Sequence, residues 1–217
     1  VRSSAASDVY KRQLYIYVIL SFISMGIVNA RSITIQQTID WPEFMSSQDM
    51  IWEVLPEYWH ESAYLGNGRL GLMIYKEPEK NYIRFETSNF DVHDHREKRD
   101  VFGTPRLLTG HFALHPEGEI ISGKMRLDLW NAEATTDILT TKGAIHLKTF
   151  VHADDMIMII KATTEGEEKD FQWEWIAAEA NSPRYLFFKN QGKMDKIPQD
   201  YQLNPAAEIS KKDDINL

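Results

Sequence analysis

The chain has 217 residues, with 24 basic and 32 acidic side chains, a net charge of −8 and 12% aromatic residues. An acidic chain without a basic stripe argues against a nucleic-acid partner. The absence of Cys rules out a disulfide framework, and the length suits one domain or a large β-sandwich.

Residues 1–30 carry the pattern of a secretory signal. Residues 1–13 lack an initiator Met and resemble translated sequencing-adapter sequence followed by a basic n-region, Lys11-Arg12. Residues 14–30 supply the apolar run Leu14–Val28 and the small-residue cleavage pattern Val28-Asn29-Ala30. The run is shorter than the roughly 20 apolar residues of a membrane span. We expect cleavage after Ala30, a periplasmic or secreted protein, and no membrane association afterwards; an uncleaved anchor is the alternative.

The remaining residues, 31–217, predict one β-sandwich domain that is truncated at its C-terminus. Apolar and polar residues alternate in short segments, and turn signals separate the segments with no helical period between them. The predicted strands are Ser32–Ile39, Leu70–Tyr75, Asn81–Glu86, Gly123–Trp130, Ala134–Thr141, Ala144–Val151, Met156–Ile160 and Phe171–Trp175. This pattern predicts an all-β, antiparallel sandwich.

Three side-chain patterns in these strands lead to specific expectations. In Gly123–Trp130, Met125, Leu127 and Leu129 should share one face of the strand, because they alternate with charged residues on the other face. Met156–Ile160 is apolar throughout, which predicts a central strand buried on both faces. The residues Trp130, Trp173 and Trp175 should lie in the core or on a sheet face.

The segment AYLGNGRLGLMIY, residues 63–75, contains the spacing G-x-G-x-x-G at Gly66, Gly68 and Gly71. A dinucleotide site needs a strand before this motif and a helix that begins on it. Here a short apolar run ended by Lys76-Glu77-Pro78 follows the glycines, which predicts a strand. We therefore expect a tight glycine turn before a core strand, and no dinucleotide or other cofactor.

The densest polar cluster is Asn89-Phe-Asp-Val-His-Asp-His-Arg96. If the segment is extended, Asp91, His93 and His95 share one face. Three interpretations stay open: a divalent metal site, a solvated loop of charges, and a loop that contacts sugar hydroxyls. The other histidines considered, His111, His115, His146 and His152, are scattered along the chain, and we expect them to be structural.

Two segments resemble glycoside hydrolase family 95, the α-L-fucosidase type. The first, Trp52–Tyr75, contains LGNGRLGLMIY, and the second, Leu127–Thr163, reads LDLWNAEATTDILTTKGAIHLKTFVHADDMIMIIKAT. The resemblance extends over about residues 41–190 and departs from the family at residues 84–96, where members carry a segment like Q-L-N-E-D-T-L-W-S-G. It implies the N-terminal β-super-sandwich of a larger hydrolase, with the catalytic carboxylates in a later (α/α)6 barrel.

The expected function follows from this resemblance. The chain would be the N-terminal sandwich of a secreted enzyme acting on α-L-fucosides or related galacto-configured glycans, with an oligosaccharide and its own barrel as partners. A stand-alone carbohydrate-binding sandwich is the alternative, and a metal-dependent jelly-roll enzyme is a third possibility. We assign no catalytic residue and no metal ligand, because no carboxylate pair stands out. The predicted substrate-binding residues are Trp59, Asn67, Asn89, Asp91, His93, His95 and Arg96.

Overall fold

The computed structural model describes residues 39–94 and 106–208. The chain divides into two units at Ile39, and the fold below is that of the second unit, Asp40–Leu217. The predicted signal and residues 32–38 of the predicted strand Ser32–Ile39 lie outside the described residues, and Ile39 is not part of a strand. Among the described residues, no helix is long and apolar enough to cross a membrane.

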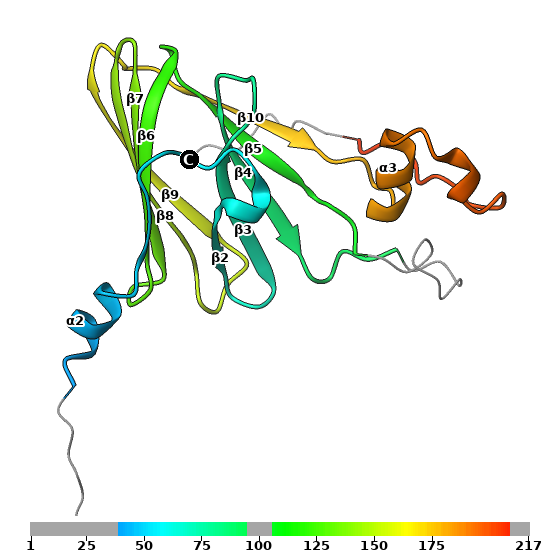
Figure 1. Ribbon diagram of the computed structural model, residues 1–217, viewed down its shortest axis with the longest axis horizontal. Coiled ribbons are helices and arrows are strands. Elements are labelled where there is room, and N and C mark those ends of the chain that lie inside the picture. The colour runs from blue at the N-terminus through cyan, green and yellow to red at the C-terminus, as the bar shows by residue number, and fades with distance from the viewer. Residues whose placement is uncertain (1–38, 95–105, 209–217) are drawn as a thin grey trace, which may run out of the picture. The chain divides into compact units, whose positions relative to one another are not determined.

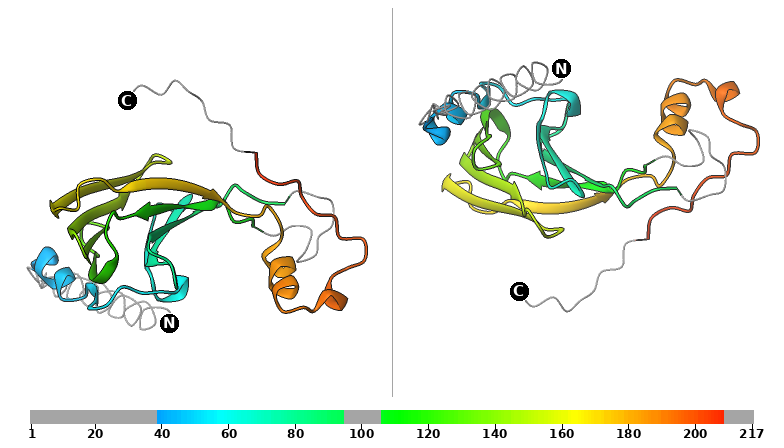
Figure 2. Two further views of the ribbon diagram at one scale, coloured as in Figure 1. Left: turned by 90° about the horizontal axis from the view of Figure 1, so that it is seen from above. Right: turned by 90° about the horizontal axis from the view of Figure 1, so that it is seen from below.

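Two five-stranded antiparallel sheets form the domain, as the all-β prediction expected (Figures 1 and 2). Sheet A has the order β1-β6-β7-β8-β9, and sheet B has the order β10-β5-β4-β3-β2. The strands of sheet A are β1 (Met50–Trp52), β6 (Ile120–Asp128), β7 (Glu133–Thr140), β8 (Gly143–Val151) and β9 (Met158–Gly166). The strands of sheet B are β2 (Ala63–Gly66), β3 (Leu70–Lys76), β4 (Ile83–Asn89), β5 (Gly110–His115) and β10 (Gln172–Ala177).

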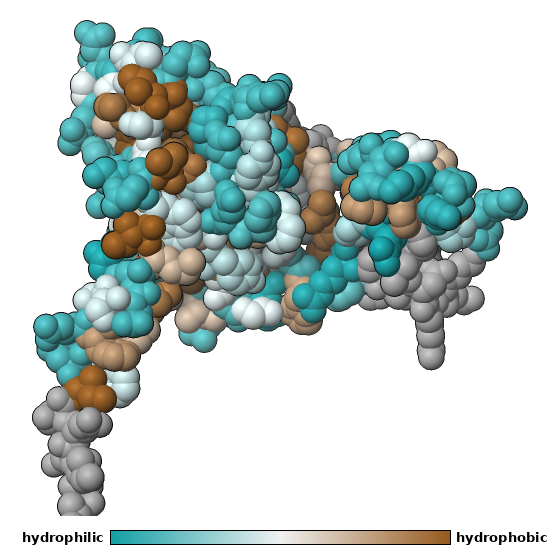
Figure 3. Space-filling view, viewed as in Figure 1, coloured by the Kyte–Doolittle hydropathy of each residue, from teal (hydrophilic) through white to brown (hydrophobic). Residues whose placement is uncertain are grey.

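One hydrophobic core lies between the inner faces of the two sheets. Sheet B contributes Leu72, Ile74 and Phe85, and sheet A contributes Met125 and Ile138, each with an exposed fraction of 2% or less. Alternation explains the division, because successive residues of a strand point to opposite faces. The outer side of sheet A carries ion pairs, such as Lys148 with Glu133. On the face seen in Figure 3, hydrophobic residues form small separate groups within a mostly hydrophilic surface.

The fully buried carboxylate of Glu168 joins two connections between strands at one end of the sandwich. Glu168 accepts hydrogen bonds from the backbone N–H groups of Glu117 and Gly118 and from the hydroxyl of Thr140. The first two donors precede β6, and Thr140 ends β7. Glu168 therefore ties the β5–β6 connection to the β7–β8 hairpin.

Several expectations about individual residues were wrong. Met156–Ile160 is not a central strand: β9 begins at Met158 and is an edge strand of sheet A, and Ile157 is 52% exposed. Trp130 lies in a turn and is 50% exposed, and Leu129 is 38% exposed, so neither belongs to the core. Both sit just past the end of β6, where alternation no longer determines the direction of a side chain.

Helices are also present where none was expected. They are α2 (Trp41–Ser46), α3 (Pro183–Asn190) and the short 3-10 helices η1 (Trp59–Glu61) and η2 (Met194–Lys196). Asp40 caps α2 by accepting a hydrogen bond from the backbone N–H of Glu43, and Pro183 occupies the first turn of α3. These starts were recognisable, but both helices are too short to show an amphipathic period.

Candidate functional site

The glycine motif builds the turn between β2 and β3. Gly68 has φ +86°, a backbone conformation that side chains disfavour. The side chain of Asn67 stabilises the turn, because its Oδ1 accepts from the backbone N–H groups of Arg69 and Leu70. A strand follows the motif and no helix begins on it, so the expected glycine turn is confirmed.

A pocket of about 270 Å³ opens beside this turn. Four segments line it: the β2–β3 hairpin, the end of β4, residues 106–108 and the first residue of α3. The lining residues are Tyr64, Gly68, Arg69, Leu70, Gly71, Ser88, Asn89, Phe90, Arg106, Leu107, Leu108 and Pro183. None of them carries a carboxyl group.

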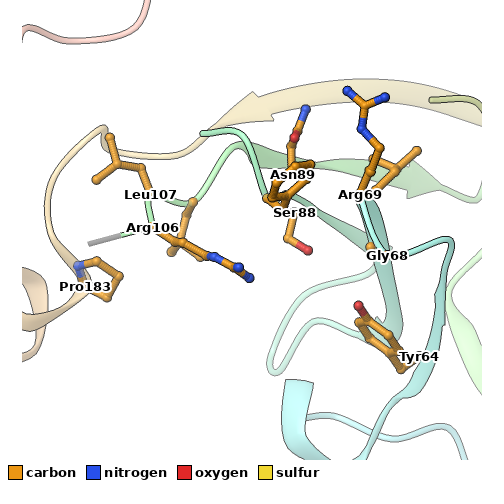
Figure 4. Close-up of a pocket in the computed structure, with 12 residues that line it drawn as sticks. Tyr64, Gly68, Arg69, Ser88, Asn89, Arg106, Leu107 and Pro183 are labelled. Atoms are coloured by element: carbon orange, nitrogen blue, oxygen red, sulfur yellow. The ribbon is translucent and has the colours of Figure 1, made fainter. Parts of the chain in front are cut away.

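Gly71 makes room for polar groups in the pocket. It pairs with Ser88 of β4, and a Cβ atom at Gly71 would lie 2.5 Å from Oγ of Ser88 and 2.9 Å from the hydroxyl of Tyr64. In Figure 4 the Tyr64 hydroxyl, the Ser88 hydroxyl and the Arg106 guanidinium are directed toward the same space. The absence of a side chain at Gly71 thus brings two hydroxyls together.

Two arginines supply the charge of the pocket. Arg69 pairs with Asp91 at 3.1 Å and lies over the ring of Phe90, 5.9 Å from its centroid. Both partners of this ion pair are at least half exposed, so the pair contributes little stability. Arg106 is exposed, and no carboxylate within residues 39–94 and 106–208 forms an ion pair with it. The pocket is therefore cationic in a chain with an overall negative charge.

The structure separates the predicted site residues. Asn89 lines the pocket, Asp91 binds Arg69 at its rim, and His93 forms an isolated β-bridge with Arg106. Trp59 lies in η1, is 62% exposed and is not among the lining residues. His95 and Arg96 lie outside the described residues. The loop after β4 is thus joined to the pocket through Asn89, Asp91 and His93.

Asn67 has a structural role in this arrangement. Its amide donates to the backbone carbonyls of His152 and Asp155 at 2.9 and 3.0 Å, while its carbonyl oxygen holds the turn. These bonds use both amide protons and both acceptor positions of the side chain. Asn67 therefore fastens the hairpin to the β8–β9 connection and has no remaining hydrogen bond for a ligand.

Sequence reasoning missed Tyr64, Ser88, Arg69 and Arg106. Tyr64 and Ser88 could have been identified from alternation, because they occupy outward positions on strands next to the glycine turn. Arg106 and Pro183 had no local signal, since they reach the pocket only through the folded chain. Among the described residues, no three His, Asp or Glu side chains are grouped so as to hold a metal ion.

A second polar cluster lies further along the same outer face of sheet B, and none of its residues lines the pocket. The hydroxyl of Tyr75 donates to Oε2 of Glu86 at 2.5 Å, and Arg84 binds Glu77 at 2.9 Å and lies over the Tyr75 ring. Burial raises the pKa of the Tyr75 phenol well above its usual value, and the hydrogen bond to Glu86 raises it further. Tyr75 therefore stays protonated and serves as a hydrogen-bond donor.

His111 lies next to this cluster and is only 6% exposed. Its ring stacks on Tyr82, and its Nε2 is buried without a hydrogen-bond partner among the described residues. Burial, assisted by the positive charge of Arg84, lowers the pKa of His111, whereas the hydrogen bond to Asp137 raises the pKa of His146 on sheet A. The folded chain therefore disfavours the protonated form of His111 and favours the protonated form of His146.

We expect His111 to make the fold sensitive to acid. The pKa of His111 is lower in the folded chain than its ordinary value of about 6.5. Below that pH the unfolded chain binds more protons than the folded chain, so the stability of the fold decreases as the pH decreases. In His111→Gln, the loss of melting temperature between pH 7.5 and pH 5 should be smaller than in the wild type. His146→Gln should show a larger loss, because a raised pKa contributes stability at low pH that is lost as pH rises. An unchanged acid loss in His111→Gln would contradict this assignment.

A scan against protein-family models finds no match to this chain, and a search of curated proteins finds none either.

Proposed function

We propose that this chain is the N-terminal β-sandwich of a secreted glycoside hydrolase acting on α-L-fucosides or related galacto-configured glycans. One observation supports the proposal: the segment that carries the family resemblance also lines the pocket. Four of its lining residues, Gly68, Arg69, Leu70 and Gly71, belong to the LGNGRLG segment on which the family resemblance rests. The same segment therefore supplies both the resemblance and part of the pocket lining.

The chemistry of the pocket suits a sugar. Hydroxyl, amide and guanidinium groups of Tyr64, Ser88, Asn89 and the arginines offer donors and acceptors to vicinal hydroxyls, and the rings of Tyr64 and Phe90 offer apolar faces. A volume of about 270 Å³ lies just below the range of about 300–1,000 Å³ typical of ligand pockets. That size favours one sugar ring rather than several.

The same lining argues against hydrolysis within the pocket. Glycoside hydrolysis uses two carboxyl groups that flank the scissile bond. The pocket has none, and Asp91 beside it forms an ion pair with Arg69. The proposal therefore places the chemistry in an (α/α)6 barrel of the longer protein, with the loop after β4 contributing to sugar binding.

The alternative is a stand-alone carbohydrate-binding sandwich. A pocket with hydroxyls and aromatic rings but no carboxylate is also what a binding module requires. The two candidates differ in what the coding sequence holds after Leu217: several long amphipathic helices favour the hydrolase, and a stop codon favours the binding module.

An activity comparison tests the hydrolase proposal. The chain alone should not hydrolyse aryl α-L-fucosides or aryl galactosides, whereas the longer protein encoded by the same gene should. Turnover by the purified chain that disappears when one of its own carboxylates is replaced would contradict the proposal. A longer protein without glycosidase activity would leave only the binding module.

A further inference from the structure

We infer that the pocket binds an acidic sugar, with Arg106 as the cation that selects it. The class is a galacto-configured sugar that carries a carboxylate or a sulfate ester. This inference rests on the proposed function and narrows its substrate: a neutral fucoside or galactoside would leave the charge of the pocket unused.

The first argument is the charge balance of the lining. Both ionisable side chains in the lining that carry a charge at neutral pH are arginines, and no lining residue is acidic. Asp91, which is not a lining residue, forms an ion pair with Arg69 at 3.1 Å and offsets its charge. Arg106 then provides one positive charge with no acidic partner among the described residues.

The second argument is geometric. The guanidinium of Arg106 is directed toward the space shared by the Tyr64 and Ser88 hydroxyls (Figure 4). A guanidinium presents a planar fork that matches a carboxylate or a sulfate group, and the two hydroxyls can donate to the same anion. Gly71 keeps that space open, since any side chain there would collide with both hydroxyls.

The third argument is energetic. A cation in a partly enclosed pocket gains more from an anion than from a neutral hydroxyl, because the attraction between opposite charges adds to the hydrogen bond. The ion pair between Arg69 and Asp91 is exposed and weak, so it competes little with a ligand and leaves Arg69 able to turn toward one.

Matched pairs of ligands test the inference by calorimetric titration of the chain. One pair is trigalacturonate and its methyl ester, and the other is a sulfated galactose trisaccharide and its desulfated form. We expect the anionic member of at least one pair to bind roughly ten- to a hundredfold more tightly than its neutral counterpart. The pair that shows the difference identifies the anion as carboxylate or sulfate.

Three variants test whether Arg106 is the residue that selects the anionic ligand. Arg106→Gln should weaken binding of the anionic ligand roughly ten- to a hundredfold and leave binding of the neutral one almost unchanged. Arg106→Lys should recover part of the loss, because it keeps the charge without the fork. Lys124→Gln is the matched control: it removes one exposed positive charge from the outer side of β6 and should change neither. Unchanged melting temperatures will show that each variant is folded.

The outcomes separate the two proposals. Equal binding of acid and ester, with Arg106→Gln matching the wild type, would overturn the acidic-sugar inference and leave glycan binding intact. An equal loss in Arg106→Gln and Lys124→Gln would also overturn it, because the effect would then reflect net charge alone. If no oligosaccharide binds, sugar binding by the pocket fails together with the inference.

Discussion

Replacement of Glu168 by Ala should lower the free energy of unfolding by roughly 3–5 kcal/mol. The carboxylate is fully buried and accepts three hydrogen bonds, from two backbone N–H groups before β6 and from the Thr140 hydroxyl. In the alanine variant, the buried N–H group of Gly118 loses its acceptor, which is the costly case, and the N–H of Glu117 and the hydroxyl of Thr140 lose the same partner. Urea denaturation measures the change as a shift of the midpoint at constant m-value.

The neighbouring residue provides the control. Glu167 is exposed, and its link to the hairpin is the backbone bond from its N–H to the carbonyl of Lys142, which survives substitution. Glu167→Ala should therefore stay within about 0.5 kcal/mol of the wild type. Equal midpoints for the two alanine variants would show that Glu168 does not hold the loops together.

Phe85→Ala should cost about 3–5 kcal/mol, because it opens a cavity in the centre of the core. Phe85 lies in the middle of β4, has no exposed surface, and packs its ring 5.2 Å from that of Trp173 on β10. It also pairs with Ile74 on one side and Phe112 on the other. The lost contacts therefore involve strands β3, β5 and β10.

Two further variants provide stability losses to compare with that of Phe85→Ala. Phe85→Leu keeps most of the volume and should cost less than the alanine variant. Phe187→Ala removes a ring that is 50% exposed on α3 and should cost less than about 1 kcal/mol. A small loss for Phe85→Ala, similar to that of Phe187→Ala, would contradict the assignment of the core.

The strands with regular alternation were predictable from the sequence. In β6, Met125 and Leu127 face the core and Lys124 and Arg126 face outward, as the pattern indicated. The error at β9 has a physical cause: an apolar run shows that a segment avoids water, but not whether a second strand lies on its far side. That depends on pairing with residues distant in the sequence.

The candidate site was only partly predictable. The glycine turn was identified because Gly68 needs a special backbone conformation that leaves a trace in the sequence. Asn67 looked like a polar group available to a sugar, and only the fold shows that its hydrogen bonds are directed to the β8–β9 connection. Arg106 lies far from Ser88 in the sequence, so no local pattern could place the two residues in the same pocket.

The most direct test of the proposed sugar site is an NMR titration of the chain with galacto-configured oligosaccharides, neutral and acidic. We expect the largest changes in amide shifts at the β2–β3 turn, at residues 88–90 and at residues 106–108, which line the pocket. Changes centred instead on Trp173, which is 41% exposed on the edge strand β10, would place sugar binding elsewhere. No change at millimolar ligand would contradict the account.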